Sequence, residues 1–420
     1  MSRRLVGSVA ATLVMVLAAG CGGSSGADGK VELSLGLFSD FGYDKLIEEY
    51  QASHSNIKIE QRKVKMEQHN TQLATQLAGG RGAADIVALE EGVVSQFRAS
   101  KDKFVNLADY GAKDLKSQWA DWKWNQGTTE GGEFVLGLGT DMGSLGLCYR
   151  RDLFQAADLP TDRAEVAKLW PTWADYAKVA DQFTAKSPNV KFVDTGRNVY
   201  KAILDQTEEG YFAKDDSYIA DKNDKVKTAF DTAAALGTKK QTGALEPFSQ
   251  DWNVALKQGS FATTTCPAWA MALIKAGAGD GAAGKWDVTA APGGGGNWGG
   301  SFLAVPKQGK HPKEAYELAK WLTAPEQQKR IFKDTGNLPS QPAVYKDAEV
   351  QKTVNEYFNS APVGQIFATS AESLKPTYRG TKDSKVTPIF NSALQRVEQG
   401  KQPAADAWTQ ALKEAQDAVK

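Results

Sequence analysis

The sequence is poor in cysteine and histidine and carries no excess of either charge. It has three Cys and three His in 420 residues, and their scattered positions give none of the spacings expected of a metal site. Because 50 Lys and Arg balance 50 Asp and Glu and no basic run exceeds two residues, we expect no nucleic acid among the partners. Residues 5–19 form the one apolar run long enough to concern a membrane, which excludes a protein with several membrane spans.

The first twenty residues have the features of a secretory signal. Two arginines precede the apolar run of residues 5–19, which is short for a spanning helix. The run ends in Leu17-Ala18-Ala19-Gly20-Cys21, which resembles a bacterial lipobox, and a Gly- and Ser-rich stretch follows. The resemblance implies removal of residues 1–20, a lipid on Cys21 and a flexible tether over residues 21–30. The alternative is an ordinary secretory signal that leaves Cys21 unmodified.

The other two cysteines have a pairing that the sequence leaves open. Cys148 and Cys266 both lie in apolar runs. In an oxidising exterior such residues form a disulfide, whereas in a packed core they remain as two buried thiols. Both interpretations fit the sequence.

The segment after the tether alternates strand and helix patterns. Strands show as alternating apolar and polar residues or short apolar runs, and helices as apolar residues at i, i+3, i+4 and i+7. The predicted order is a strand over Val31–Leu37, a helix from Tyr43, a strand from Ile57, a helix over residues 69–78 and a strand over Asp85–Leu89. This order predicts a parallel sheet covered by helices, and so an α/β fold. Because ligands of such sheets collect beyond the carboxyl ends of the strands, we expect Phe38–Asp40 and Glu90 at one rim.

The strand and helix pattern restarts after residue 140. Strands are predicted over Ser144–Arg150, Phe261–Cys266 and Ser301–Val305, and Thr172 begins a capping-box match for a helix. The rest of the chain is predicted to be mostly helical, with helices over residues 312–323, 325–333, 347–359, 386–398 and 403–418. Two α/β lobes are the natural interpretation.

Motifs of known chemistry are absent or out of context. Gly294–Gly299 fits the dinucleotide pattern G-x-G-x-x-G, but a strand follows it where a helix N-terminus has to hold the pyrophosphate. Gly279–Lys285 has the glycines of a phosphate loop, but Trp286 stands where Ser or Thr holds magnesium. We therefore expect no cofactor, no metal and no enzyme. The paired carboxylates of a glycosidase are the one catalytic arrangement that 50 acidic residues leave open.

Four stretches carry positive information. Leu322–Lys329 and Thr335–Pro339 have the sequences LTAPEQQK and TGNLP, a proline-started helix closed by glycine. Trp252–Ala262 is a helix, a glycine stop and the start of a strand, and Phe134–Arg150 is a long strand-like run. Together they resemble the extracellular solute-binding proteins of carbohydrate ABC importers, the maltose-binding-protein-like group called solute-binding family 1.

The resemblance implies a two-lobed periplasmic-binding-protein-like fold of type II, in which hinge-connected lobes enclose a ligand cleft. The implied first lobe covers residues 30–139 and 302–346, the second covers residues 145–297 and 347–420, and residues 140–144 and 298–301 are hinge crossings.

Neutral sugars offer hydroxyl groups and apolar C–H faces, which suit polar side chains and aromatic platforms. Trp269 and Trp298 lie beside loops and are the expected platforms, with core packing as the alternative for each. The full set of candidate ligand-binding residues is Trp269, Trp298, Glu90, Asp141, Asp40, Ser39, Asn70, Gly300, Ser301 and Arg379, with Tyr211 and His69 as weaker candidates. The alternatives are a helix N-cap for Glu90, a structural hinge bond for Asp141 and a surface salt bridge for Arg379.

The sequence and its resemblance together predict a monomeric, membrane-tethered receptor. It captures a neutral oligosaccharide, with a xylo- or cello-oligosaccharide as the narrower hypothesis, and delivers it to an ABC permease. One rival keeps the scaffold but binds a polyol, a phosphorylated metabolite or a peptide. Phosphate needs an Arg and Lys cluster at the rim, and the sequence identifies none. The other rival is a surface-anchored enzyme that acts on glycosides.

Overall fold

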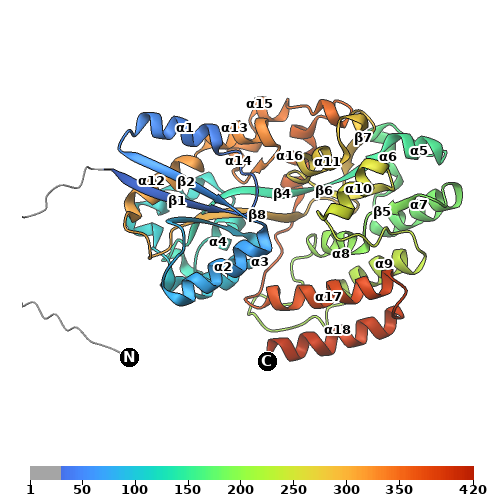
Figure 1. The fold of residues 1–420 in the computed structure, drawn as a ribbon. Helices are drawn as coiled ribbons and strands as arrows, with labels where there is room; N and C mark the ends of the chain where they lie inside the picture. Colours follow the sequence, from blue (N-terminus) through green and yellow to red (C-terminus); the bar gives the residue numbers. More distant parts are fainter. Residues whose placement is uncertain (1–29) are drawn as a thin grey trace, which may run out of the picture.

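The computed structural model describes residues 30–420. The predicted signal peptide, Cys21 and nearly all of the predicted tether lie outside the described residues. Two α/β lobes stand side by side, joined by strands that cross between them (Figure 1). None of the helices in the described part has the length and apolar character needed to cross a membrane.

The elements are as follows. The strands are β1 (Val31–Leu37), β2 (Ile57–Lys63), β3 (Ile86–Glu90), β4 (Gly137–Arg150), β5 (Lys191–Val193), β6 (Phe261–Pro267), β7 (Trp286–Ala290), β8 (Asn297–Ala304) and β9 (Leu338–Pro339). The α-helices are α1 (Asp44–Ser53), α2 (Met66–Gly79), α3 (Glu91–Ala99), α4 (Asp121–Gln126), α5 (Arg151–Ala156), α6 (Arg163–Leu169), α7 (Trp173–Lys186), α8 (Gly196–Leu204), α9 (Asp224–Thr238), α10 (Gln250–Gln258), α11 (Ala270–Ala278), α12 (Pro312–Leu322), α13 (Pro325–Thr335), α14 (Pro342–Tyr345), α15 (Ala348–Gln351), α16 (Val363–Ser373), α17 (Asp383–Glu398) and α18 (Ala404–Val419). The 3-10 helices are η1 (Lys101–Lys103), η2 (Leu107–Tyr110), η3 (Ala112–Gln118), η4 (Glu130–Gly132), η5 (Asp280–Ala282) and η6 (Glu356–Phe358).

The first lobe is built on the predicted parallel strands. The strand order is β2-β1-β3-β8-β4, in which β1 runs parallel to β2 and β3, while β8 is antiparallel to β3 and β4. The apolar residues that alternate along β1, Leu33, Leu35 and Leu37, are all buried in the core beneath α1 and α12. Their burial explains the alternating sequence pattern that predicted this strand. The carboxyl ends of β1, β2 and β3 therefore meet at one edge of this sheet.

The second lobe uses the far half of β4. There β4 pairs antiparallel with β6 and β7, and β5 lies parallel to β6. Large aromatic side chains fill this core, with Trp170, Tyr176 and Trp286 almost fully buried. The helices α8, α9, α17 and α18 form a layer beside this sheet, at the lower right of Figure 1.

The strands β4 and β8 connect the two lobes, and their pairing is irregular at the crossing. Register shifts occur between Gly139 and Met142 and between Met142 and Ser144. Gly300 has φ +103°, and a Cβ there would lie 2.5 Å from the carbonyl oxygen of Asp141. Only glycine allows the two crossing backbones to come so close.

Most of the predicted elements are confirmed. The predicted capping box is present, because Thr172 Oγ1 accepts a hydrogen bond from the backbone N–H of Asp175 at 3.2 Å. The single helix predicted over residues 347–359 is wrong. The chain forms only the short α15 and η6 there, because it turns back at Asn359 (φ +54°) and Asn355 bridges to Ala361. The helix α16 that follows was not predicted.

The two cysteines left open by the sequence form a disulfide. Cys148 lies on β4 and Cys266 on β6, neighbouring strands of the second lobe, and their sulfur atoms are bonded. The strand pairing brings together residues 118 positions apart in the chain. The interpretation as two buried thiols is therefore wrong, although both residues are buried.

Candidate ligand-binding site

The rim of the first lobe holds the residues that follow β1. Ser39 and Asp40 are exposed there, and Asp40 Oδ1 accepts a hydrogen bond from the backbone N–H of Gly42 at 3.0 Å. Lys63, at the end of β2, lies 3.8 Å from the same carboxylate. Ser39 and Asp40 therefore lie at the rim, as the predicted strand order indicated. The carboxylate of Asp40 is already shared by local partners.

Glu90 ends β3 where the two lobes meet. Its Oε2 accepts a hydrogen bond from the backbone N–H of Gly92 at 2.7 Å, so the N-cap role considered from the sequence is present. Its Oε1 faces the crossing strand, since a Cβ on Gly299 would lie 3.5 Å from it. Burial raises the pKa of Glu90, and the positive charges of Lys201 and Arg379 offset part of this effect. Oε1 accepts no hydrogen bond from another described residue, so it remains available as an acceptor.

The indoles of Trp269 and Trp298 lie together beside Glu90. Their ring centroids are 6.2 Å apart with the planes at 86°, and Trp269 Nε1 donates to the carbonyl oxygen of Trp298 at 2.9 Å. Both side chains are half-buried, which differs from the complete burial of Trp170 and Trp286 in the core. Phe248, which was not among the predicted site residues, also packs here, with 5.5 Å between its ring centroid and that of Trp269.

Arg379 approaches from the second lobe. Its guanidinium pairs with the fully buried carboxylate of Asp205, and it lies 3.8 Å from Asp383. Its backbone oxygen accepts a hydrogen bond from Ser95 Oγ on α3 of the first lobe at 2.7 Å. Arg379 therefore forms an ion pair, but a largely buried one at the contact between the lobes instead of the surface salt bridge considered from the sequence.

A chain of charged contacts links Arg379 to the indoles. Lys201 on α8 pairs with Asp205 at 2.9 Å, and its ammonium group lies 5.3 Å from the ring centroid of Trp298. The structure thus gathers Glu90, Trp269, Trp298 and Arg379 into one region, from four distant parts of the sequence.

The other residues predicted to bind ligand either lie apart from this group or have a structural role in the crossing strands. Asp141 accepts a hydrogen bond from the Oγ1 of its chain neighbour Thr140 at 2.8 Å. Ser301 is buried opposite Glu90 in the β3–β8 pair, and Gly300 serves the strand crossing. Asn70 Oδ1 is buried without a hydrogen-bond partner among the described residues.

The two weaker candidates have structural partners. His69 Nε2 lies 2.8 Å from the carbonyl oxygen of Ala88, and burial lowers the pKa of His69. Tyr211 stacks on Phe390 in the helical layer of the second lobe, with 5.0 Å between the ring centroids.

Two buried charges beside the site were missed by the sequence analysis. Glu91 accepts hydrogen bonds from Gln126 Nε2 at 3.1 Å and from the side chain of Asn297, and burial raises the pKa of Glu91 to about 7. Lys123 is fully buried, its Nζ has no hydrogen-bond partner in residues 30–420, and it lies 4.1 Å from the ring centroid of Phe302. Burial lowers the pKa of Lys123, while Glu91 attracts its charged form. A lysine between Trp122 and Trp124 is the signal that a closer examination of the sequence offers.

The fold and this site define a class of protein: two lobes joined by crossing strands, with aromatic and charged side chains gathered where the lobes meet. The family described as bacterial extracellular solute-binding protein matches residues 45–358. The chain belongs to this family.

Individual relatives agree with that assignment. A crystal structure described as extracellular solute-binding protein family 1 is 44% identical, with a TM-score of 0.84, covering 93% of this chain and 100% of the other. The arabinooligosaccharide-binding protein of Bacillus subtilis (strain 168) is 24% identical over 407 residues, 91% of each chain. The ABC transporter associated binding protein from B. animalis subsp. lactis Bl-04, solved with beta-1,6-galactobiose, has a TM-score of 0.78 at 20% identity, covering 92% of this chain and 96% of the other. This last likeness shows the shared fold.

Proposed function

We propose that this protein is the substrate-binding component of an ABC importer, and that it captures a neutral oligosaccharide between its lobes. The observation that carries the proposal is the pair of half-buried indoles, Trp269 and Trp298, set at right angles beside Glu90 Oε1 and the Lys201–Asp205–Arg379 chain. Apolar faces next to hydrogen-bonding groups suit a sugar, which has both kinds of surface.

The expected energetics fit such a receptor. Stacking one sugar face on an indole hides about 100 Å² of apolar area, which contributes roughly 2.5 kcal/mol before ordering costs. Two platforms together with several hydrogen bonds give micromolar or tighter binding.

The narrower proposal is a xylo- or cello-oligosaccharide as the ligand. The names of the relatives support the saccharide class, since one is an arabinooligosaccharide-binding protein and another was solved with a galactobiose. They leave open which sugar this chain prefers, so the experiment below includes those sugars as well.

We also propose that the lobes divide as the resemblance implied, with hinge crossings at residues 140–144 and 298–301, and that the ligand shifts the balance between open and closed forms. The irregular β4–β8 pairing and the positive φ of Gly299 and Gly300 support a hinge at this point. A lipid on Cys21 would tether a monomer to the outer face of the membrane, beside its permease.

The test is a thermal-shift screen of the purified protein with xylo-, cello-, arabino-, galacto- and malto-oligosaccharides, followed by calorimetry on each hit. A ligand at one hundred times its Kd is expected to stabilise the protein by about 2.7 kcal/mol. Release of shorter sugars during incubation would instead favour the glycoside-acting enzyme. A shift with a polyol, a peptide or a sugar phosphate but with no oligosaccharide would favour another solute.

The indole platforms give the first mutational prediction. Trp269→Ala and Trp298→Ala are each expected to weaken oligosaccharide binding by roughly tenfold or more, because each removes a stacking face. Trp321→Ala is the matched control, since Trp321 packs on Tyr50 in the first lobe, with 5.2 Å between ring centroids. Equal affinity in all three variants, measured by calorimetry, would contradict the placement of the ligand.

A further inference from the structure

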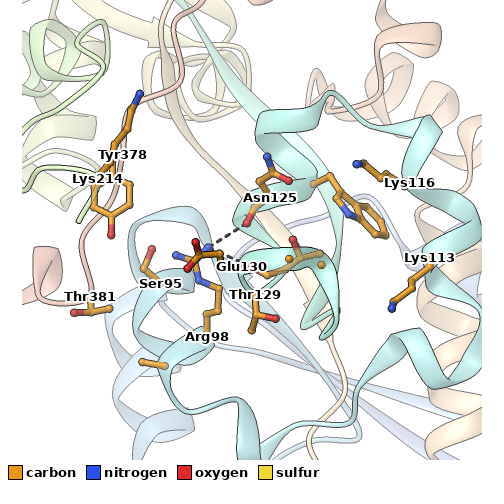
Figure 2. A pocket seen from close by; sticks show the side chains of 15 residues that line it. Ser95, Arg98, Lys113, Lys116, Asn125, Thr129, Glu130, Lys214, Tyr378 and Thr381 are labelled. Atoms are coloured by element: carbon orange, nitrogen blue, oxygen red, sulfur yellow. Dashed lines mark hydrogen bonds between the residues drawn. The ribbon is translucent and has the colours of Figure 1, made fainter. Parts of the chain in front are cut away.

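A groove of about 780 Å³ lies at the far end of α3 from Glu90. Figure 2 shows that side chains of both lobes line it, with Ser95 and Arg98 of α3 on one side and Lys214, Tyr378 and Thr381 of the second lobe on the other. The segment between α4 and β4 forms another wall, with Asn125, Thr128, Thr129 and Glu130. This volume is in the range of small-molecule sites in proteins, and large enough for a sugar unit.

The groove carries an excess of positive charge. Its lining has four cationic side chains, Arg98, Lys113, Lys116 and Lys214, against one carboxylate, that of Glu130. This is the kind of Arg and Lys cluster that the sequence analysis failed to identify, because its members lie far apart in the chain.

Two of the four cations have a carboxylate as a surface partner. The Nζ of Lys113 lies 3.1 Å from Glu133 Oε2, and the Nζ of Lys116 lies 4.0 Å from Asp121 Oδ1. In Figure 2 both lie to the right, away from Tyr378.

Arg98 and Lys214 are the cations that remain. Within the described part of the chain neither has a carboxylate within 4.0 Å. Arg98 Nη1 donates to the carbonyl oxygens of Asn125 at 3.1 Å and Thr128 at 3.3 Å, which orients the guanidinium. Its Nε and Nη2 make no hydrogen bond to another described residue, so they can form a two-point contact with an anion.

The neutral lining groups offer a sugar mainly hydrogen-bond acceptors, since Ser95, Tyr378 and Thr381 donate their hydroxyl hydrogens to the carbonyl oxygen of Arg379 and the carboxylate of Asp216. The groove is lined by the hydroxyl-bearing side chains of Ser95, Thr128, Thr129, Tyr378 and Thr381 together with the amide of Asn125. Free inorganic anions need charge and little else, whereas a sugar acid needs donors and acceptors for its hydroxyl groups as well.

The groove is close to the proposed sugar site and is separated from it by one contact between the lobes. Ser95 Oγ donates to the carbonyl oxygen of Arg379 at 2.7 Å, and Ser384 Oγ donates to Gln96 Oε1 at 3.0 Å. Arg98 lies eight positions after Glu90, which corresponds to about 12 Å along a helix axis. One branched or extended sugar chain spans such a distance.

We propose that this groove is an anion subsite, in which Arg98 and Lys214 bind the acidic group of a sugar unit carried by the captured oligosaccharide. The proposal rests on the proposed function and extends it: neutral units occupy the cleft, and a charged unit of the same chain occupies the groove. A carboxylate and a phosphate ester share the chemistry that these two cations recognise.

The experiment compares matched pairs of sugars by calorimetry on the purified protein. One pair is xylotriose with and without a glucuronic acid branch, and the other is cellotriose with and without a terminal uronic acid. In at least one pair, the acidic member is expected to bind about tenfold tighter than its neutral partner, and the advantage to shrink as ionic strength rises. Glucose 6-phosphate is tested alongside, and binding that depends on Arg98 and Lys214 would identify phosphate as the group recognised.

The variants are Lys214→Gln and the double variant Arg98→Gln/Lys214→Gln, and both are expected to reduce the advantage of the acidic sugar. Lys214→Gln alone keeps the test decisive if the loss of the Arg98 hydrogen bonds disturbs the fold. Lys352→Gln, an exposed lysine outside the groove, is expected to preserve the advantage.

Two other results would overturn the inference, and they differ. If the neutral sugars bind and the acidic ones bind no better, the groove is not an anion subsite, while the proposed function stands. If no saccharide of either pair binds, and none of the wider screen does, the proposed function fails and the anion subsite fails with it.

Discussion

At the scale of single residues, the notable feature is charge buried where the lobes meet. Glu91 is 3% exposed and Lys123 is fully buried. A buried charge is costly unless hydrogen bonds or opposite charges compensate it. Glu91 has both, because the amides of Gln126 and Asn297 donate to it and Arg379 and Lys123 attract it.

The raised pKa of Glu91 gives a prediction about pH. With a pKa of about 7 in the folded protein and an ordinary value of 4.5, folded Glu91 holds its proton where the unfolded chain has lost it. The stability contributed by Glu91 is therefore complete below about pH 4.5 and is lost as the pH rises to 7. Glu91→Gln, which cannot titrate, is expected to reduce the fall in the free energy of unfolding between these pH values by about 1–3 kcal/mol.

Urea denaturation at pH 5 and pH 7 measures this difference. Glu90, Asp194 and Asp383 also have raised pKa values, so they contribute to the pH dependence of the wild type. The contribution of Glu91 is therefore taken as the difference in pH dependence between Glu91→Gln and the wild type. Glu133→Gln, at an exposed glutamate, is the control and should keep the wild-type pH dependence. The same fall in Glu91→Gln as in the wild type would contradict the assignment.

At the scale of elements, β4 is the strand on which both lobes depend. Its 14 residues are nearly all buried, since it pairs with β8 and β9 at one end and with β6 and β7 at the other. The Cys148–Cys266 disulfide fastens β4 to β6 within the second lobe. A bond that closes a loop of this length restricts the unfolded chain far more than the folded one.

Removal of this disulfide is expected to destabilise the protein without abolishing ligand binding. Cys148→Ala/Cys266→Ala should lower the free energy of unfolding by about 2–5 kcal/mol. Chemical denaturation with and without a reducing agent measures the loss, and reductant should affect the wild type alone. Thiol titration of the denatured, unreduced protein is the check: if Cys148 and Cys266 react, the pairing is wrong.

At the scale of the whole molecule, the relation between the lobes is set by a few close approaches. The strands β4 and β8 cross where Gly143 and Gly300 leave no room for a side chain, since a Cβ on Gly143 would lie 1.7 Å from the carbonyl oxygen of Trp298. On the far side of the contact, Ser95 and Ser384 bridge the lobes through their hydroxyl groups. The geometry of these crossings therefore determines how the proposed ligand groups face one another.

The crossing gives a prediction for the proposed hinge. Gly300→Ala combines a positive φ with a clash at 2.5 Å, so it is expected to destabilise the protein by about 1–3 kcal/mol and to weaken oligosaccharide binding. Gly400→Ala is the control, because Gly400 also has a positive φ (+67°), whereas a Cβ there would have no other atom within 4 Å. Thermal denaturation and calorimetry compare them, and equal effects would show that the close crossing does not matter.

The sequence allowed the local structure and the family to be predicted because those depend on neighbouring residues. Apolar spacing located β1, α1 and α7, and the proline and glycine around Pro325 and Gly336 located α13. The prediction of one helix over residues 347–359 was wrong, because the chain turns at Asn359 in spite of the helical spacing of its apolar residues. The candidate site was predicted in part: Glu90, Trp269, Trp298 and Arg379 lie together, whereas Asp141, Gly300 and Ser301 serve the crossing strands.

By itself, then, the sequence determined the α/β class, most helix and strand positions, and the resemblance that the family match bears out. Only the tertiary structure decided that Cys148 bonds Cys266, that Glu91 and Lys123 are buried, and that Arg98 and Lys214 line one groove. The physical reason is distance along the chain. Hydrogen-bonded turns and side-chain periodicity act over a few residues, whereas these contacts arise from strand pairing within a lobe and from packing between the lobes, which join residues more than a hundred positions apart.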